Sequence, residues 1–315
     1  MAKIFKATLK TSFISSPCIF AAVFAFGLGM FEAFMYIVQF DGMSFDDTKL
    51  LNMDTYVFFP FLIVMLPALL TGKEISSGTV RNKLITGTTK TGFFMAHLIV
   101  NSLISISLVF LYFLPMLIFC AKYFDHFTPY MVAFAIVCVI LGCLVITAVS
   151  TLFAVMFDKM IFGLAASVLL LLAFIWCSSW ISSDLSQPKY EEYYDTNAYA
   201  VQSNESDDPS MESHGDLNPY YIESKTQRRL LWTASHIMPF EIITNGCSII
   251  SEKLTSYRCY LDAKKEAKDV FEQDDKALII YERTRELFYV PFYSIGVTLF
   301  VSALGVFLFK RRNIK

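Results

Sequence analysis

The chain has 315 residues, of which 55% are hydrophobic, 16% aromatic and only 17% charged. Soluble domains contain about 45–50% apolar and about 25% charged residues. The 26 Lys and Arg residues nearly balance the 28 Asp and Glu residues, so the basic footprint of a nucleic-acid-binding protein is absent. The composition excludes a soluble enzyme, a disordered scaffold and a small disulfide-rich secreted domain. It indicates an all-α polytopic membrane protein.

Six stretches are apolar enough to cross a bilayer as helices, which takes about 20 residues each. The second contains Pro60 and Pro67 and is the shortest, which favours a kink or a tilt. The first follows a basic start, as a signal peptide does, but no A-x-A-like cleavage site follows it, so we expect it to be retained. The predicted spans are residues 17–40, 56–70, 93–121, 130–157, 160–181 and 289–309.

Basic residues mark the cytoplasmic loops of membrane proteins. They gather before the first predicted span, after the second and after the sixth, whereas the loop after the first span is acidic. Both termini are therefore predicted to lie in the cytoplasm, with the chain as a multi-pass protein of the cell membrane. The basic residues concerned are Lys3, Lys6, Lys10, Lys73, Arg81, Lys83, Lys90, Lys310, Arg311, Arg312 and Lys315.

Three parts follow from this topology: spans one to five in residues 1–181, an extracytoplasmic segment in 182–288, and span six with its tail in 289–315. The external segment carries 20 acidic and 12 basic residues, a net charge of −8. Its first part is polar and tyrosine-rich, whereas residues 253–286 have a helix-forming composition. We expect a mainly helical insertion. A disulfide between Cys247 and Cys259 is possible there, although spacing does not define pairing.

Motifs for catalysis are missing from the sequence. The only Gly-Lys pair, Gly72-Lys73, lacks the first glycine and the following Ser or Thr of a phosphate-binding loop. The four histidines have no metal-ligand spacing. We therefore expect no catalytic residues, no metal site and no ATPase activity in this chain.

Polar residues inside spans are the usual functional candidates in membrane proteins. Glu32 is the one acidic residue well inside a predicted span, and it either lines a substrate path or reaches the outer interface. Asn101, in the third predicted span, is the second candidate for such a path.

The basic segment between the second and third predicted spans is the most informative part of the sequence. Val80 and Leu84 are one helical turn apart, and Arg81 and Lys83 are left for solvent or a partner. One interpretation is a membrane-surface helix attracted to anionic lipid. However, Glu74 and Gly78-Thr79-Val80, followed by Leu84, Gly87 and Lys90, resemble the coupling-helix region of the ABC type-2 permeases.

Other parts of the chain also resemble that family: six spans with both ends inside, the amphipathic start, Met238-Pro239 before the last span, and the basic C-terminal tail. The chain departs from the family at His97, where a lysine is common, and in its long external segment. The resemblance implies a coupling helix at about 73–90 that docks on a separate ATP-binding subunit. The docking residues would be Glu74, Gly78, Val80, Arg81, Leu84 and Lys90.

The resemblance further implies a permease subunit of an ATP-driven exporter, paired with a second permease in the bilayer. ATP and Mg²⁺ would bind to the ABC ATP-binding subunits and not to this chain. Few charges and many Phe residues suit amphipathic or lipophilic cargo such as antimicrobial or cytolytic peptides, drugs or lipids. The alternative is a membrane receptor or assembly protein that binds a partner through its external helical segment.

Overall fold

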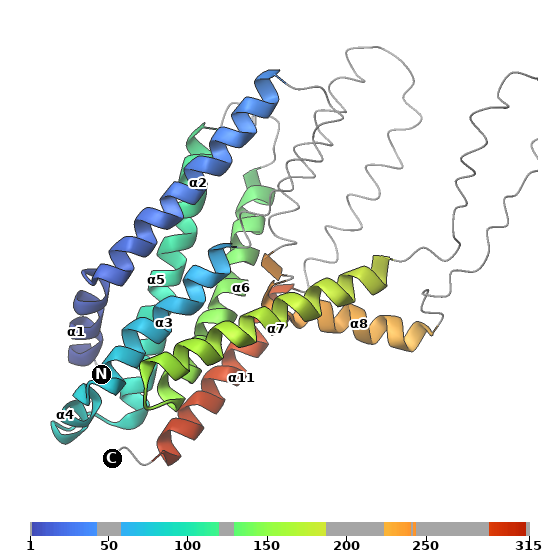
Figure 1. The fold of residues 1–315 in the computed structure, drawn as a ribbon. Helices are drawn as coiled ribbons and strands as arrows, with labels where there is room; N and C mark the ends of the chain where they lie inside the picture. The colour runs from blue at the N-terminus through green and yellow to red at the C-terminus, as the bar shows by residue number, and fades with distance from the viewer. Residues whose placement is uncertain are drawn as a thin grey trace, which may run out of the picture. The chain divides into compact units, whose positions relative to one another are not determined.

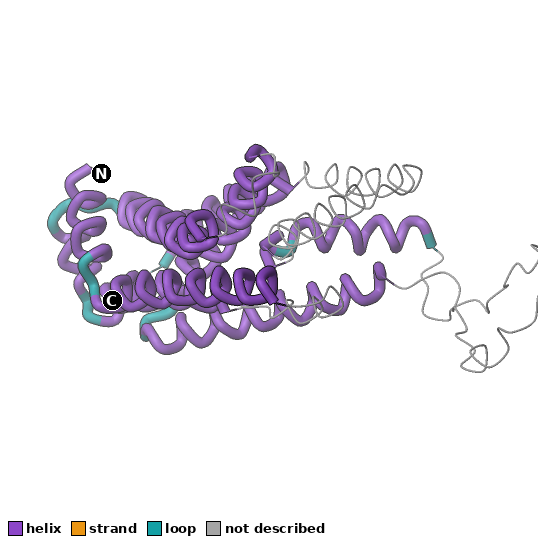
Figure 2. Tube along the Cα trace, turned by 90° about the horizontal axis from the view of Figure 1, so that it is seen from above, coloured by secondary structure: helices purple, strands orange, loops and turns teal. Residues whose placement is uncertain are grey.

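The structure, a computed structural model, describes residues 2–42, 58–119, 129–186, 224–240, 242–243 and 290–312. Within these ranges all regular secondary structure is helical (Figures 1 and 2). Most of the predicted external insertion, including Cys247 and Cys259, lies outside the described residues. The predicted disulfide therefore stays a prediction.

The prediction of six spans is confirmed, because six of the described helices are long and apolar enough to cross a membrane. The third predicted span and the fourth begin and end within a few residues of the helices observed. The second differs more, since its helix continues past Leu70 to Ser76. The six helices are α2 (Ser16–Gly42), α3 (Phe58–Ser76), α5 (Lys90–Phe119), α6 (Pro129–Met156), α7 (Met160–Ser186) and α11 (Val290–Arg311).

The described residues also include three shorter helices, α1 (Ala2–Phe13), α4 (Thr79–Ile85) and α8 (Lys225–Ile237). The chain forms two compact units, one of Met1–Ile175 with His236–Lys315 and the other of Trp176–Ser235. The first unit holds the bundle that includes α1 to α6 and α11. In the second unit, the Ser224 hydroxyl accepts a hydrogen bond from the Gln227 amide and caps the first turn of α8.

Helices α3, α5 and α6 form the centre of the first unit. Helix α2 packs along α5, α3 packs along α6, and α11 contacts both α6 and α5. Their shared core is apolar and is built around Phe59, Ile104, Leu108 and Tyr112. Buried hydroxyls also join these helices. For example, Ser105 and Thr147 lie 2.7 Å apart across α5 and α6, so polar contacts supplement van der Waals packing where lipid gives no hydrophobic driving force.

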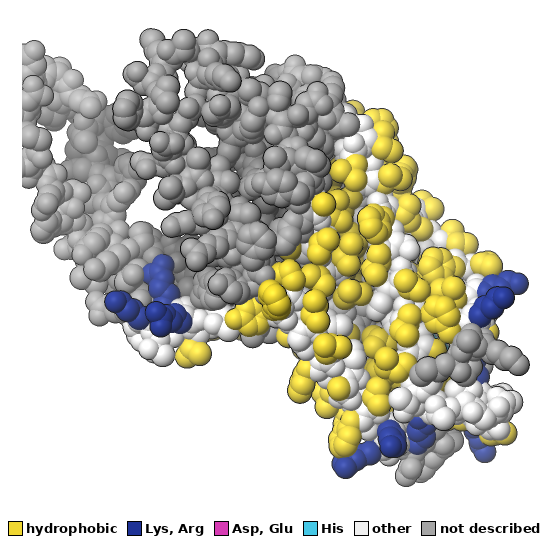
Figure 3. Space-filling view, turned by 180° about the vertical axis from the view of Figure 1, so that it is seen from behind, with side chains coloured by type: hydrophobic (Ala, Val, Ile, Leu, Met, Phe, Trp, Pro, Cys, Tyr) yellow, Lys and Arg dark blue, Asp and Glu magenta, His cyan; other side chains and the backbone are white. Residues whose placement is uncertain are grey.

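Both ends of the chain lie at the end of the first unit that carries α4 (Figure 1). We call this region, formed by α4, the start of α5 and residues 310–312, the α4 end. Lys and Arg side chains gather there, whereas apolar side chains cover the neighbouring surface of the bundle (Figure 3). Such a division between a basic end and an apolar body agrees with the boundary of a membrane.

The outer helices α2, α7 and α11 expose large apolar side chains, as expected of surfaces that face lipid or another membrane protein. The exposed residues of these helices within the first unit include Phe20, Val23, Phe31, Phe34, Ile161, Phe162, Leu169, Leu172, Phe292, Leu299, Phe300 and Phe307.

The crossing of α2 and α5 depends on Gly29. A Cβ atom at this position would lie 2.0 Å from the Tyr112 carbonyl oxygen, which belongs to the backbone and cannot move aside. Small residues are what allow two membrane helices to approach so closely. Gly27, two residues earlier and on the opposite side of the same helix, has open space around it.

We therefore predict that Gly29→Ala lowers the thermal unfolding midpoint of the purified protein in detergent, whereas Gly27→Ala leaves it unchanged or raises it. The first change forces the helices apart, and overpacking costs about 1–3 kcal/mol. The second adds a methyl group in open space and improves helix propensity. Equal midpoints for the two variants would show that the α2–α5 crossing does not need a glycine.

Candidate functional site

Two left-handed glycines define α4, the short helix between α3 and α5. Gly78 precedes it with φ 72°, and Gly87 follows it with φ 95°. At its end the Gly87 amide donates to the Leu84 carbonyl and the Thr88 amide donates to the Lys83 carbonyl, both at 3.1 Å. These two bonds with a left-handed glycine constitute a Schellman motif. Thr89 then caps α5 by accepting from the Gly92 amide at 3.1 Å.

A small apolar core holds one side of α4 against the bundle. Val80 is only 2% exposed and packs with Phe93, Phe94 and Phe309, and the half-buried Leu84 lies against the same cluster. Phe94 also fills the space beside Gly305 of α11, where a Cβ atom would lie 2.3 Å from its ring. The apolar side of α4 is therefore an internal surface of the protein.

Glu74, on the last turn of α3, is bound by two groups from other helices. Its Oε2 atom lies 2.5 Å from Lys83 Nζ of α4 and 3.1 Å from His97 Nε2 of α5. The Glu74 side chain is 20% exposed and the His97 side chain 1%. One carboxylate oxygen thus joins three helices, and charge-assisted hydrogen bonds in such a partly buried place are stronger than neutral ones.

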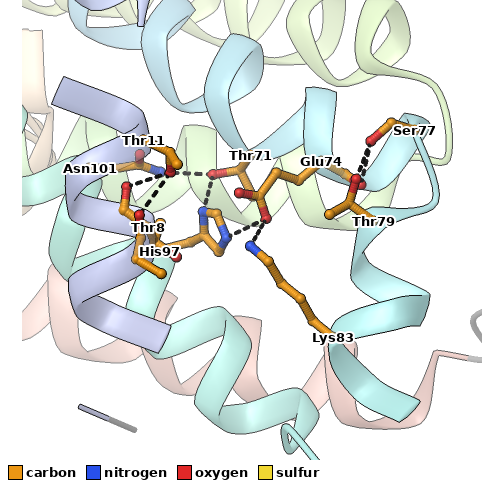
Figure 4. Close-up of polar contacts among 10 residues, drawn as sticks. Thr8, Thr11, Thr71, Glu74, Ser77, Thr79, Lys83, His97 and Asn101 are labelled. Carbon is orange, nitrogen blue, oxygen red and sulfur yellow. Dashed lines mark hydrogen bonds and ion pairs between the residues drawn. The ribbon is translucent and has the colours of Figure 1, made fainter. Parts of the chain in front are cut away.

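The polar contacts continue from His97 into the centre of the bundle (Figure 4). His97 Nδ1 lies 3.2 Å from the hydroxyl of Thr71. The side-chain amide of Asn101 donates to this hydroxyl at 3.1 Å and to the hydroxyl of Thr151 at 3.0 Å. All four side chains are at most 2% exposed. We call the six residues Lys83, Glu74, His97, Thr71, Asn101 and Thr151 the α4–core network.

The chemistry of these groups gives the network a direction. A carboxylate only accepts, so His97 Nε2 carries the proton that it shares with Glu74. Nδ1 lies within hydrogen-bond distance of the Thr71 hydroxyl, which can donate or accept. The Thr71 oxygen in turn accepts from Asn101. Asn101 Oδ1 is buried and has no hydrogen-bond partner among the described residues.

A second set of contacts closes the α4 end from the side of α11. The Lys90 amine, at the start of α5, donates to the carbonyl oxygens of Lys310 at 3.3 Å and of Arg312 at 2.5 Å. The Arg312 guanidinium binds the Val155 carbonyl of α6 and the Asp158 carboxylate. Cationic side chains thus cap the carboxyl ends of two helices, where carbonyl groups lack partners within the helix.

Four of the six predicted docking residues have partners within the chain. Glu74, Val80 and Leu84 are engaged within the chain, and so is Lys90. Gly78 shapes the backbone before α4. Arg81 is the one predicted docking residue with an exposed charged side chain, and beside it Ile85 is 74% exposed. We call Arg81 and Ile85 the exposed face of α4.

The two residues predicted to line a substrate path have separate partners. Asn101 belongs to the α4–core network, and Glu32 of α2 accepts a hydrogen bond from the Tyr112 hydroxyl. Tyr112 is 11 residues beyond Asn101 on α5, or about 16 Å along the helix. Among the described residues no group of three or more His, Cys, Asp or Glu side chains could hold a metal ion.

Sequence reasoning missed Thr71, Thr151 and the internal pairing of Lys83. A signal for part of this was present: Thr71 with Glu74, and His97 with Asn101, are polar pairs spaced by one helical turn at the edge of apolar runs. Such a stripe indicates a polar contact between helices. It does not identify the partner helix.

No protein-family model, curated protein or solved structure matches this chain.

The positive φ of Gly78 allows a test of whether its left-handed backbone conformation stabilises α4. We predict that Gly78→Val speeds tryptic cleavage after Arg81 about 5- to 30-fold, because the left-handed conformation costs an L residue about 1–2 kcal/mol. The Gly78→Asn variant should be cleaved nearly as slowly as the wild type, since Asn tolerates this conformation. Both side chains have open space, with no atom within 4 Å of the added Cβ. Equal cleavage of the two variants would contradict the backbone explanation.

Proposed function

We propose that this chain is the membrane-spanning subunit of an ATP-driven exporter of the ABC type-2 class. The observation that carries the proposal is α4 itself. It is a short helix at the basic end of a six-span bundle, fixed on one side by a buried core and a paired carboxylate, with Arg81 and Ile85 exposed on the other. A rigid exposed helix is suited to transmit movement from a partner protein.

The exposed face of α4 is the proposed contact with an ATP-binding subunit. Ile85 supplies a large apolar side chain that would be buried in a groove, and Arg81 supplies a charge for an acidic residue of that groove. Glu74, which the resemblance assigns to docking, instead pairs with Lys83 inside the permease. They hold α4 in place while the opposite face binds.

The mechanism follows from a change of state in the partner. ATP and Mg²⁺ bind to two ATP-binding subunits, and ATP binding brings these subunits together. Each α4 then moves with the subunit on which it docks, and the two permeases of the complex change their relative orientation. The energy comes from the different affinity of ATP for the two states, and the permease supplies an interface with two arrangements.

The proposed cargo is amphipathic or lipophilic, for example a cytolytic or antimicrobial peptide, a drug or a lipid. The exposed sides of α2, α7 and α11 are apolar and rich in Phe. Together they offer surface for lipid, for a second permease and for an apolar path between the two permeases. The chain itself would catalyse no reaction.

The proposal predicts the loss of a binding partner. When the chain is purified from its native membranes in mild detergent, an ABC ATP-binding subunit should co-purify. Arg81→Glu and Ile85→Asp should each reduce its recovery at least tenfold, because removing one side of a buried contact costs about 2–5 kcal/mol. Separated from this subunit, the chain should show no ATPase activity.

Lys10→Glu is the matched control, since Lys10 is an exposed cation on a different helix, α1. It should leave recovery of the ATP-binding subunit unchanged. Equal losses from Lys10→Glu and Arg81→Glu would indicate attraction to charge in general, such as anionic lipid. ATPase activity that persists after complete removal of the partner would reject the proposed role. Recovery of a different protein through the external segment would favour the receptor interpretation.

The proposed orientation is tested by labelling single cysteines in intact cells. A membrane-impermeant thiol reagent should modify Asp207→Cys, in the external segment, without permeabilisation. Ser77→Cys, which is exposed beside α4, should react only after the membrane is opened. Labelling of Ser77→Cys in intact cells would place α4 outside and exclude a cytoplasmic ATP-binding partner.

A further inference from the structure

We infer that Asn101 and Thr151, buried in the centre of the bundle, are positioning residues for α4 and act on it through Thr71, His97 and Glu74. This inference rests on the proposed function in one respect: the coupling would serve partner binding, because α4 is the element proposed to bind the partner. The coupling between the core and α4 is a property of the chain alone.

The hydrogen-bond geometry carries the inference. Asn101, on α5, uses both hydrogens of its amide, one toward Thr71 of α3 and one toward Thr151 of α6. A single planar group therefore fixes the mutual position of the three central helices. A hydrogen bond weakens steeply with distance and angle, so a shift of any one helix against the other two changes at least one of these bonds.

The path from this amide to α4 has no gap. Thr71 contacts His97 at 3.2 Å, His97 contacts Glu74 at 3.1 Å, and Glu74 contacts Lys83 of α4 at 2.5 Å. His97 is also fixed from the side, since its ring lies 4.3 Å, centroid to centroid, from that of Phe93. Because the ring cannot turn freely, a displacement of Thr71 reaches Glu74 as a change in the His97 contact.

The buried oxygen of Asn101 would favour any arrangement of the central helices that gives it a donor. Asn101 Oδ1 is buried and has no partner among the described residues, and a buried polar atom without a hydrogen bond is a cost to the structure. An arrangement of α3, α5 and α6 that satisfies this oxygen would relieve the cost. Such an arrangement would alter the contacts of Thr71 or Thr151 and, through the network, the position of Lys83.

The experiment measures hydrogen exchange of the backbone amides of residues 79–88 in the full chain, in lipid nanodiscs without any ATP-binding protein. Thr151→Val removes the hydroxyl that accepts from Asn101 and keeps the shape of the side chain. We expect exchange in α4 to accelerate about five- to tenfold, the effect of losing an ordinary hydrogen bond. Thr151→Ser, which keeps the hydroxyl, should restore wild-type exchange.

Ser150→Ala is the matched control. Ser150 is the preceding residue of α6, is 1% exposed, and donates to the Val64 carbonyl at 2.6 Å, outside the network. Its hydroxyl also lies 3.4 Å from that of Ser167. It should leave α4 exchange unchanged. If Ser150→Ala and Thr151→Val accelerate exchange equally, loosening of the whole bundle is sufficient and the inference is overturned.

A double substitution tests the path itself. Glu74→Ala removes the oxygen that joins His97 to Lys83 and so interrupts the network between the core and α4. Thr151→Val should therefore add little further exchange in that background. Additive effects would mean that the core reaches α4 by another route. If Thr151→Val fails to fold, Thr71→Val examines the same step from α3.

The outcome also separates this inference from the proposed function. If α4 exchange responds to Thr151→Val and no ATP-binding subunit co-purifies, the coupling exists and the proposed partner is wrong. If the subunit binds and α4 exchange does not respond, the partner is right and the coupling is wrong.

Discussion

The pairing of Glu74 is the interaction on which the α4 end depends. A carboxylate near the end of an apolar helix is costly unless it is bound, and here one oxygen accepts from both Lys83 and His97. Because the two donors belong to different helices, satisfying this charge also fixes α4 and α5 relative to α3. Removing Lys83 would leave α4 attached mainly through Val80 and Leu84, and removing His97 would leave the acid with one donor.

The backbone and the side chains of α4 support the same arrangement. Gly78 and Gly87 give the sharp turns that a seven-residue helix needs between two spans. Thr89 then caps the start of α5. Within this frame, one side of the helix is buried and the other is exposed. Agreement between local turn chemistry and tertiary packing is what allows such a short helix to be stable, since short helices are marginal by themselves.

The spans could be predicted from the sequence because the bilayer requires about 20 apolar residues in each, a constraint that acts locally. The end of α3 was placed too early, at Leu70, because Lys73 and Glu74 interrupt the apolar run although the helix continues through them to Ser76. The site was harder to predict, for a physical reason. In the sequence, Glu74 and Lys90 are charged residues of a loop, as docking residues would be. Their internal partners, Lys83 for Glu74 and residues 310–312 for Lys90, come close only in the folded chain.

The contacts of α11 have a consequence for the order of assembly. Phe309 completes the apolar core beneath α4, and Arg312 reaches the carboxyl end of α6. These residues belong to the last of the six spans, so they leave the ribosome after the other five are made. Until then Val80, Phe93 and Phe94 lack their final neighbour, and the Lys90 amine lacks the carbonyl groups that it binds. The packing beneath α4 is thus incomplete during synthesis. A protein that bound α4 before the last span was made would bind a helix that is not yet fixed in place.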